Sequence, residues 1–512
     1  MISLFSVYFI LFLIFTILLY YSVPARLQWV ILLIASYIFY CLEGGWKGVV
    51  FILTTTVTSY FAGILLEKEK GAGIKRGLIL ALCLLINFGI LAALKYGSFI
   101  IDNINTLFQN AGMGILIGKP FFMLPLGISF YTFQSMGYVI DVYRDNEKTE
   151  HNLLKHALFV SYFPQIIQGP ISRHGDLSPQ LTEHHTWDDT RFREGVLRML
   201  WGFFKKIVLA ERAGIIVNEV FSNYSEQGYT GFVIFIAGLL YGIQVYADFS
   251  GGMDIVFGAS DIMGISMTEN FRQPYFAKSV SEFWQRWHIT LGAWMKQYVF
   301  YPLCLTEEAA FLQKKTRKLL GPYYGKVIVP TVASFFTFIL VGIWHGADWK
   351  YVVYGIYMAI LVSSHTLCER WYSSLRTLFR IDQGSTGWKI VQIVRTTILV
   401  LIGRFFSRGA GVSDAVSMIK AMLSSFNIWV FSDDTLLSLG LDYKNMELLI
   451  LCILILFTVD HVNEKGMRVR SLIATKSLPV RWIVYYGAIV IVLLFGIYGG
   501  EYNVSSFIYQ NF

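Results

Sequence analysis

Two histidines lie where an imidazole could carry out acid–base chemistry. His345 ends an apolar run in GIWHGADWKYVVYG (342–355), and His288 lies in EFWQRWHITLGAWMKQYVFYPL (282–303). Imidazole titrates near neutral pH, so it suits a reaction in which a hydroxyl group loses a proton. Ionisable groups in apolar runs are costly and often functional, although a histidine that only makes a structural hydrogen bond is the alternative in each case. We interpret both histidines as candidate catalytic residues.

Other reactive motifs are absent from the sequence. There is no Gly-x-Ser-x-Gly elbow, phosphate-binding loop or dinucleotide fingerprint, which leaves histidine-assisted transfer onto an alcohol as the favoured chemistry. The adjacent pair His184–His185 has no Cys or Glu partners at metal-ligand spacing, so no metal site is predicted. The five cysteines form no CxxC pair and are interpreted as small core residues.

The stretch around His288 has the pattern of an amphipathic helix. Helical spacing from Trp284 to Tyr298 places Trp284, Trp287, Leu291, Trp294 and Tyr298 on one side, with Arg286 opposite and His288 at the edge. We therefore predict one helix that ends before Pro302 and lies in the membrane interface or dips into the protein. An anchor helix without a catalytic role is the competing interpretation.

Polar residues precede this stretch, in YADFSGGMDIVFG and ENFRQPYF. They include Asp248, Asp254, Asp261, Glu269, Asn270 and Arg272. We predict a mouth on the cytoplasmic side that receives a charged substrate. Its inner side is expected to be shaped by Trp284, Arg286, Trp287, Asn270 and Asp248.

The rest of the chain predicts an all-α polytopic membrane protein. Of its 512 residues 55% are hydrophobic and only 15% are charged, whereas soluble domains carry about a quarter charged residues. Apolar runs near the length of a membrane span lie at 1–23, 27–42, 48–66, 78–94, 121–140, 195–210, 231–247, 327–348, 351–368, 390–406, 446–461 and 482–499. Two broken apolar stretches, 157–170 and 283–303, are interpreted as re-entrant or interfacial. The run 1–23 lacks the basic start of a signal peptide and is expected to be a retained helix.

Basic residues predict the orientation in the membrane. With the N-terminus outside, the cytoplasmic segments hold 29 of the 42 Lys and Arg residues and the outer segments hold eight. Both termini are then extracytoplasmic, and 413–445 is an outer loop or surface helix. The net charge of +8 is explained by these loops and by anionic lipid, and no nucleic-acid motif is present.

Several motifs together resemble the membrane-bound O-acyltransferase (MBOAT) superfamily, and most of all its alginate O-acetylation branch. They are LPLGISFYTFQSMGYVIDVYR (124–144), YFPQIIQGPISR (162–173), YADFSGGMDI (246–255), ENFRQPYFAKSVSEFWQRWHITLGAW (269–294), GIWHGADWKYVVYG (342–355) and the ending SFIYQNF. The resemblance implies one membrane domain over 1–512, with core motifs at about 120–370 and extra C-terminal helices at about 390–512. It also implies a ring of about 11–13 transmembrane helices around a thin centre that is pierced by a tunnel.

The resemblance further implies roles and partners in a bacterial cell membrane. His345 would be the principal catalytic residue, and His288 would be catalytic or supporting. No cofactor is expected; the acyl donor would be a cytosolic thioester, either acetyl-CoA or an acylated carrier protein. The acceptor would be an extracytoplasmic polysaccharide, reached through an acetyltransferase- or esterase-like partner protein.

The chain departs from the family pattern after the first histidine. It reads Trp294-Met295-Lys296-Gln297-Tyr298 and then Pro302-Leu303-Cys304-Leu305, without the carboxylate and paired glycines that are common in relatives. This difference leaves the donor open. A D-alanyl transferase acting on teichoic acid is the close alternative, and a membrane transporter is a second one, although no inverted repeat is visible.

Overall fold

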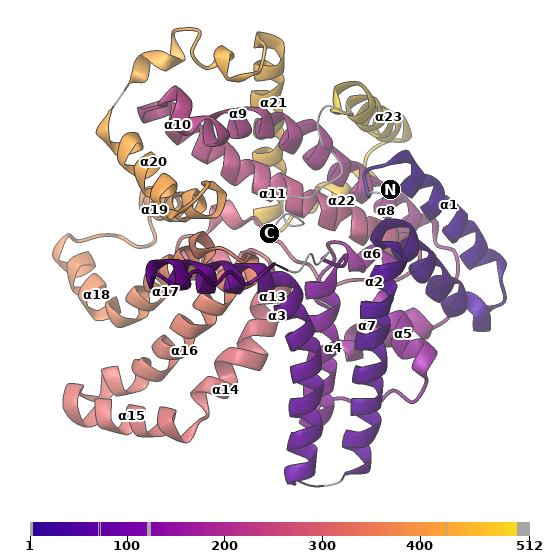
Figure 1. Cartoon of the computed structure of the whole chain (residues 1–512). Helices are drawn as coiled ribbons and strands as arrows, with labels where there is room; N and C mark the ends of the chain where they lie inside the picture. The colour runs from indigo at the N-terminus through magenta and orange to yellow at the C-terminus, as the bar shows by residue number, and fades with distance from the viewer. Residues whose placement is uncertain (1–3, 70, 72, 120–123, 426, 499–512) are drawn as a thin grey trace. The chain divides into compact units, whose positions relative to one another are not determined.

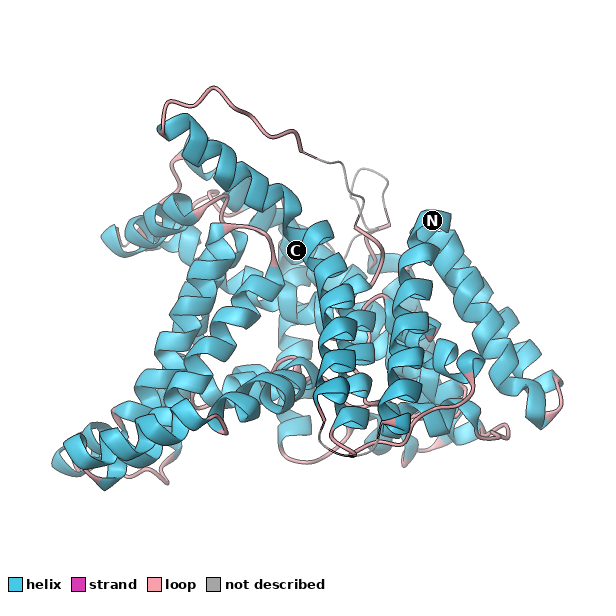
Figure 2. Cartoon of the chain, turned by 60° about the horizontal axis from the view of Figure 1, so that its bottom comes forward, coloured by secondary structure: helices cyan, strands magenta, loops and turns pink. Residues whose placement is uncertain are grey.

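A computed structural model describes residues 4–69, 71, 73–119, 124–425 and 427–498. The residues described there form helices, turns and loops, and no β-sheet (Figure 2). Their contacts divide into two compact units, Met1–Phe203 with Gly252–Glu269, and Phe204–Gly251 with Asn270–Phe512. The ending SFIYQNF lies outside the described residues. The prediction of an all-α protein is confirmed.

Seven helices within the described residues are long and apolar enough to cross a membrane. They are Ala25–Lys68, Ile74–Asn110, Gly231–Ile262, Pro322–His345, Thr386–Arg408, Tyr443–Glu464 and Leu478–Phe495. A bent pair, Trp349–Leu367 with Glu369–Leu378, makes up to eight. This is fewer than the 11–13 expected, because several apolar runs form shorter helices and Ala25–Lys68 contains two helices that meet at a kink at Gly45.

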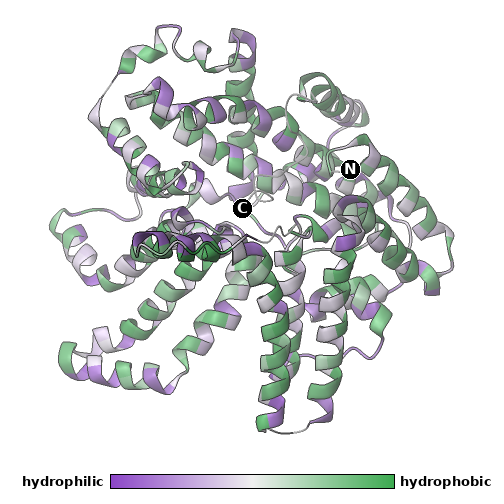
Figure 3. Cartoon of the chain, in the orientation of Figure 1, coloured by the Kyte–Doolittle hydropathy of each residue, from purple (hydrophilic) through white to green (hydrophobic). Residues whose placement is uncertain are grey.

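The first unit consists mainly of helices from the N-terminal half of the chain (Figure 1). They are α1 (Val7–Ser22), α2 (Gln28–Lys68), α3 (Ile74–Asn110), α4 (Ile128–Tyr143), α5 (Leu153–Ser161), α6 (Phe163–Ile166), α7 (His174–Thr182) and α8 (Asp189–Phe203). The runs 27–42 and 48–66 form the two parts of α2, which are separate helices on either side of a kink at Gly45, where φ is 69° and ψ is 162°. Most of α2 and α3 is hydrophobic (Figure 3).

The second unit begins with a π-helix, η2 (Phe204–Ala210), and contains both candidate catalytic histidines. Its helices are α9 (Glu211–Ser222), α10 (Tyr224–Gln227), the first part of α11 (Gly231–Ile262), α12 (Val280–Arg286), α13 (Ile289–Met295), α14 (Tyr301–Cys304), α15 (Glu307–Leu320), α16 (Pro322–His345), α17 (Trp349–Leu367), α18 (Glu369–Leu378), α19 (Thr386–Arg408), α20 (Val412–Ser424), α21 (Tyr443–Glu464), α22 (Val469–Ala474) and α23 (Leu478–Phe495). The short segments η3 (Pro274–Phe276), η4 (Lys296–Phe300), η5 (Ile428–Phe431) and η6 (Leu437–Leu439) complete it.

Helices α16 and α17 form a close hairpin that ends beside His345. A Cβ atom at Gly342 would lie 2.5 Å from the carbonyl oxygen of Tyr351 and 2.6 Å from the Cα atom of Gly355. Asp348 caps the start of α17 by accepting a hydrogen bond from the Lys350 amide. Glycine at 342 and 355 therefore lets the two backbones touch, as is common between membrane helices.

The predicted continuous helix around His288 is wrong. Helix α12 ends at Arg286, Trp287 is extended, and His288 has φ 47° and ψ 54°, a left-handed conformation that is uncommon outside glycine. The reason is a pairing with distant backbone, which helical periodicity cannot reveal. Phe271 and Trp287 form an antiparallel bridge, and the Ile289 amide donates to the Asn270 carbonyl at 3.0 Å.

The side chain of Asn270 stabilises the start of α13, the helix that follows this break. Its Oδ1 atom accepts hydrogen bonds from the amide and the hydroxyl of Thr290, at 3.0 and 2.9 Å, and lies 3.3 Å from Nδ1 of His288. Asn270 thus caps the N-terminus of α13 from a position 20 residues away in the sequence. Both Asn270 and His288 are buried.

The α16–α17 contact predicts a stability difference between two glycine substitutions. Gly342→Ala forces the two backbones apart and should destabilise the protein by about 1–3 kcal/mol, as overpacking typically does. Gly487→Ala is the control, because no heavy atom lies within 4 Å of its added Cβ in α23. Thermal unfolding midpoints in detergent should fall for the first variant only. Equal midpoints would contradict the close packing.

The Asn270 contacts predict a graded loss of stability at the helix break. Thr290→Ala removes one donor and should cost about 1 kcal/mol, whereas Asn270→Ala leaves several buried donors without an acceptor and should cost more. The same thermal measurement compares them. An Asn270→Ala protein as stable as Thr290→Ala would show that the break is held by other contacts.

Candidate active site

His345 is the last residue of α16, and it is enclosed by aromatic rings. Its ring centroid lies 5.1 Å from that of Trp344 and 5.7 Å from that of Tyr354 in α17, and only 6% of the residue is exposed. A Cβ atom at Gly346 would overlap the ring of Tyr351, so glycine is needed directly after the histidine. The α16–α17 turn therefore fixes the imidazole in a mostly apolar setting.

His288 also contacts Trp344. Its ring centroid is 5.7 Å from that of Trp344 and 4.9 Å from that of Phe249 in α11. The Thr290 amide can only donate, so Asn270 Oδ1 is an acceptor and Nδ1 of His288 must carry the hydrogen. Burial lowers the pKa of His288 to about 3, which keeps the ring neutral with Nε2 as an acceptor. The structure thus brings the two predicted histidines together around one tryptophan.

The two predicted tryptophans of this stretch occupy different surroundings. Trp287 is 1% exposed, and its ring is parallel to that of Phe283 with centroids 5.5 Å apart. Trp284 is half-buried and makes an edge contact with Phe338 of α16, with centroids 5.3 Å apart. Trp287 therefore packs in the protein interior directly before His288, whereas Trp284 joins α12 to α16.

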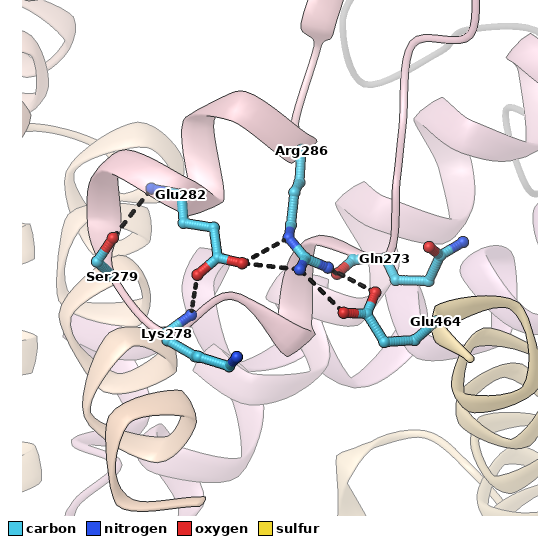
Figure 4. Close-up of polar contacts among 6 residues, drawn as sticks. All are labelled: Gln273, Lys278, Ser279, Glu282, Arg286 and Glu464. Carbon is cyan, nitrogen blue, oxygen red and sulfur yellow. Dashed lines mark hydrogen bonds and ion pairs between the residues drawn. The ribbon is translucent and has the colours of Figure 1, made fainter. Parts of the chain in front are cut away.

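Arg286 is held in a buried ion-pair cluster (Figure 4). Its guanidinium donates to both carboxylate oxygens of Glu464, at 2.6 and 2.9 Å, and to Oε1 of Glu282, at 2.7 Å. The backbone carbonyl of Gln273 is a further acceptor at 3.3 Å. The hydrogen bonds that Arg286 donates to Glu464 and Glu282 raise the pKa of its guanidinium. These contacts tie α12 to the end of α21, and the predicted role of Arg286 in lining a tunnel stays a prediction.

The carboxylates of the predicted mouth also form ion pairs. Asp248 is 1% exposed and pairs with Lys206 of η2, which also contacts Glu211 at 2.6 Å. In the first unit, Arg198 contacts Asp254 at 2.9 Å and Glu269 at 2.6 Å. These carboxylates are thus engaged in buried or half-buried pairs that stabilise each unit.

Three residues that contact the histidines or Trp287 were not identified from the sequence. Phe249 and Tyr354 contact the two imidazoles, as described above, and Arg404 of α19 lies over the ring of Trp287, 4.4 Å from its centroid. Only Arg404 carried a signal that could have been used, a basic residue inside the apolar run 390–406.

The arrangement suits proton transfer to and from a neutral imidazole. Buried imidazoles in an apolar, aromatic environment accept a proton from a bound hydroxyl when the reaction removes it. Among the residues that the structure describes, no group of three or more His, Cys, Asp or Glu side chains is placed to hold a metal ion.

Comparison with known proteins bears on the reaction. The profile of the membrane-bound O-acyltransferase family matches residues 142–323. The chain is similar to the probable alginate O-acetylase of Pseudomonas aeruginosa, with 33% identity over 81% of this chain and 73% of that protein. It is 28% identical to the peptidoglycan O-acetyltransferase of Helicobacter pylori, over 77% and 73% of the two chains.

A third relative represents the D-alanyl branch. The teichoic acid D-alanyltransferase of Bacillus subtilis is 28% identical over 56% of this chain and 68% of its own. The match is therefore shorter than those to the two acetylating proteins. With an identity above 30% to a relative that it covers over most of its length, this chain belongs to the membrane-bound O-acyltransferase family and is a multi-pass membrane O-acyltransferase.

Proposed function

We propose that this protein transfers an acetyl group from a cytosolic thioester to hydroxyl groups of an extracytoplasmic polysaccharide. The main support is the pair of buried imidazoles, His345 and His288, that share contact with Trp344. The names of two relatives, an alginate O-acetylase and a peptidoglycan O-acetyltransferase, support acetyl as the group and a polysaccharide as the acceptor.

In this proposal His345 is the general base. The hydroxyl proton of the acceptor moves to its imidazole while the oxygen bonds to the thioester carbonyl carbon, and the carbonyl electron pair moves onto oxygen. Collapse of this intermediate breaks the carbon–sulfur bond, and the leaving thiolate takes the proton from the imidazolium. His288, kept neutral by burial, supports the same site through its contact with Trp344.

The setting in the membrane explains why such an enzyme needs a passage. The headgroup of a thioester donor is charged and would be costly to move through lipid, so only the acyl carbonyl should cross. We propose a cell-membrane protein with both termini outside, a thin centre and a tunnel that Trp284, Trp287 and Asn270 help to shape. Acetyl-CoA or an acylated carrier protein would supply the group, and an acetyltransferase- or esterase-like protein outside would pass it to the polymer.

The proposal predicts that His345→Ala abolishes transfer. Loss of a general base typically lowers a rate by about 10²–10⁴-fold, so ester-bound acetate on exported polysaccharide should fall to background. The measurement is acetate released by mild alkali from purified polymer, with the membrane level of each variant checked by immunoblot. Gly487→Ala is the matched control. Undiminished acetate at a normal membrane level would exclude His345 as the base.

The same hydrolysate separates acetyl from D-alanyl transfer. We expect acetate that depends on His345 and no D-alanine that does so. The D-alanyl alternative rests on the shorter match to the Bacillus subtilis relative. His345-dependent release of D-alanine with unchanged acetate would replace the proposed acetyl group by D-alanine and leave the reaction class as it is.

A further inference from the structure

Arg404 is a buried cation near the end of a predicted membrane span. It lies one turn before the C-terminal end of α19 (Thr386–Arg408), and 5% of it is exposed. The end of α19 is joined to the turn that follows His345, because the Lys350 ammonium donates to the Gly409 carbonyl at 2.9 Å. A Cβ atom at Gly403 would lie 3.3 Å from the ring of Tyr354. Arg404 therefore lies at the same end of the helices as His345.

Arg404 and its neighbour in α19 lie against residues that adjoin the two histidines. The central carbon of the Arg404 guanidinium is 4.4 Å from the ring centroid of Trp287, the residue that precedes His288. The neighbouring residue Gly403 packs against Tyr354, whose ring is in contact with that of His345. A positive charge is thus placed against the segment that carries His288, on a helix that packs against Tyr354.

Burying a positive charge at such a position costs free energy, so its presence indicates a role in the structure or in the reaction. A cation in an apolar site interacts with a nearby negative charge far more strongly than it would in water. The proposed reaction passes through an intermediate whose former carbonyl oxygen is negatively charged. In that intermediate His345 has become an imidazolium, but it faces the attacking oxygen from which it took the proton. A fixed guanidinium can stabilise the former carbonyl oxygen without reorganisation.

We propose that Arg404 supplies the fixed positive charge that stabilises the oxyanion formed during acyl transfer, an inference that rests on the proposed function. The acceptor oxygen bonds to the carbonyl carbon, its proton goes to His345, and the carbonyl electron pair moves onto oxygen beside the guanidinium. When the carbon–sulfur bond breaks, the pair returns to form the ester carbonyl and the proton passes to the thiolate. The stack on Trp287 holds the guanidinium in place throughout.

The first test compares arginine variants of α19 in cells that make the acceptor polymer and in inverted membrane vesicles from those cells. Arg404→Gln removes the charge, Arg404→Lys keeps it without the planar group, and Arg395→Gln is the control on an exposed position of the same helix. Loss of one oxyanion donor typically lowers turnover by about 100-fold or more. Transfer of label from radioactive acetyl-CoA should fall by that factor in Arg404→Gln, with an unchanged KM, partly recover in Arg404→Lys and stay normal in Arg395→Gln.

The second test separates charge stabilisation from a structural role. Fluoroacetyl-CoA has almost the size of acetyl-CoA, but its fluorine withdraws electrons and stabilises the oxyanion by itself. The ratio of wild-type to Arg404→Gln rates should therefore shrink with this donor, to about tenfold. A purely structural defect would reduce both rates equally, and equal ratios would overturn the proposal.

Two further outcomes distinguish this inference from the function on which it rests. If His345→Ala abolishes ester-bound acetate while Arg404→Gln keeps more than half of it at a normal membrane level, only the role of Arg404 is refuted. If His345→Ala leaves acetate unchanged, the proposed function itself fails. Should Arg404→Gln not reach the membrane, the uncharged Arg404→Met takes its place, and an undiminished rate with both donors refutes the role.

Discussion

The backbone pairing between Asn270–Arg272 and Arg286–Ile289 is the constraint on which the histidine site depends. It gives Trp287 an extended conformation and His288 a left-handed one, so the chain cannot continue as a helix. The left-handed conformation costs about 1–2 kcal/mol for a residue other than glycine. That cost is offset by the bridge and by the buried hydrogen bonds of Asn270. A straight helix would have carried His288 along its own axis and away from Trp344.

Carboxylates of α21 stabilise the same region from another direction. Glu464 binds the guanidinium of Arg286, directly before the break, and Asp460 accepts a hydrogen bond from Tyr246 at 2.8 Å. The ring of Tyr246 in turn contacts that of Trp287, with centroids 6.2 Å apart. Helix α21 therefore helps to hold the segment that carries His288. Buried ion pairs contribute little net stability, but they fix one geometry among several, because leaving either partner unpaired is costly.

The sequence predicted those features that depend on local chemistry. Apolar runs identified the long helices, and His345 was correctly placed at the end of one of them, next to glycines that permit close packing. The pattern of 284–298 failed because a period of three to four residues cannot exclude a break that distant backbone imposes. The same limit applies to Asp248, whose partner Lys206 lies 42 residues earlier in an apolar run. Arg404 and Trp287 are 117 positions apart, and no local pattern joins them.

Low polarity around the two imidazoles links the fold to the chemistry. Aromatic rings surround His345 and His288, and burial keeps the imidazole of His288 neutral. The same apolar surroundings would make an oxyanion too unstable to form unless a positive charge stood nearby. In the proposed reaction, an apolar site that favours the base therefore favours a fixed cation for the intermediate, and Arg404 stacks on Trp287, the residue before His288. The charge of Arg404 and the aromatic rings around the histidines thus depend on each other, since each would hinder the proposed reaction without the other.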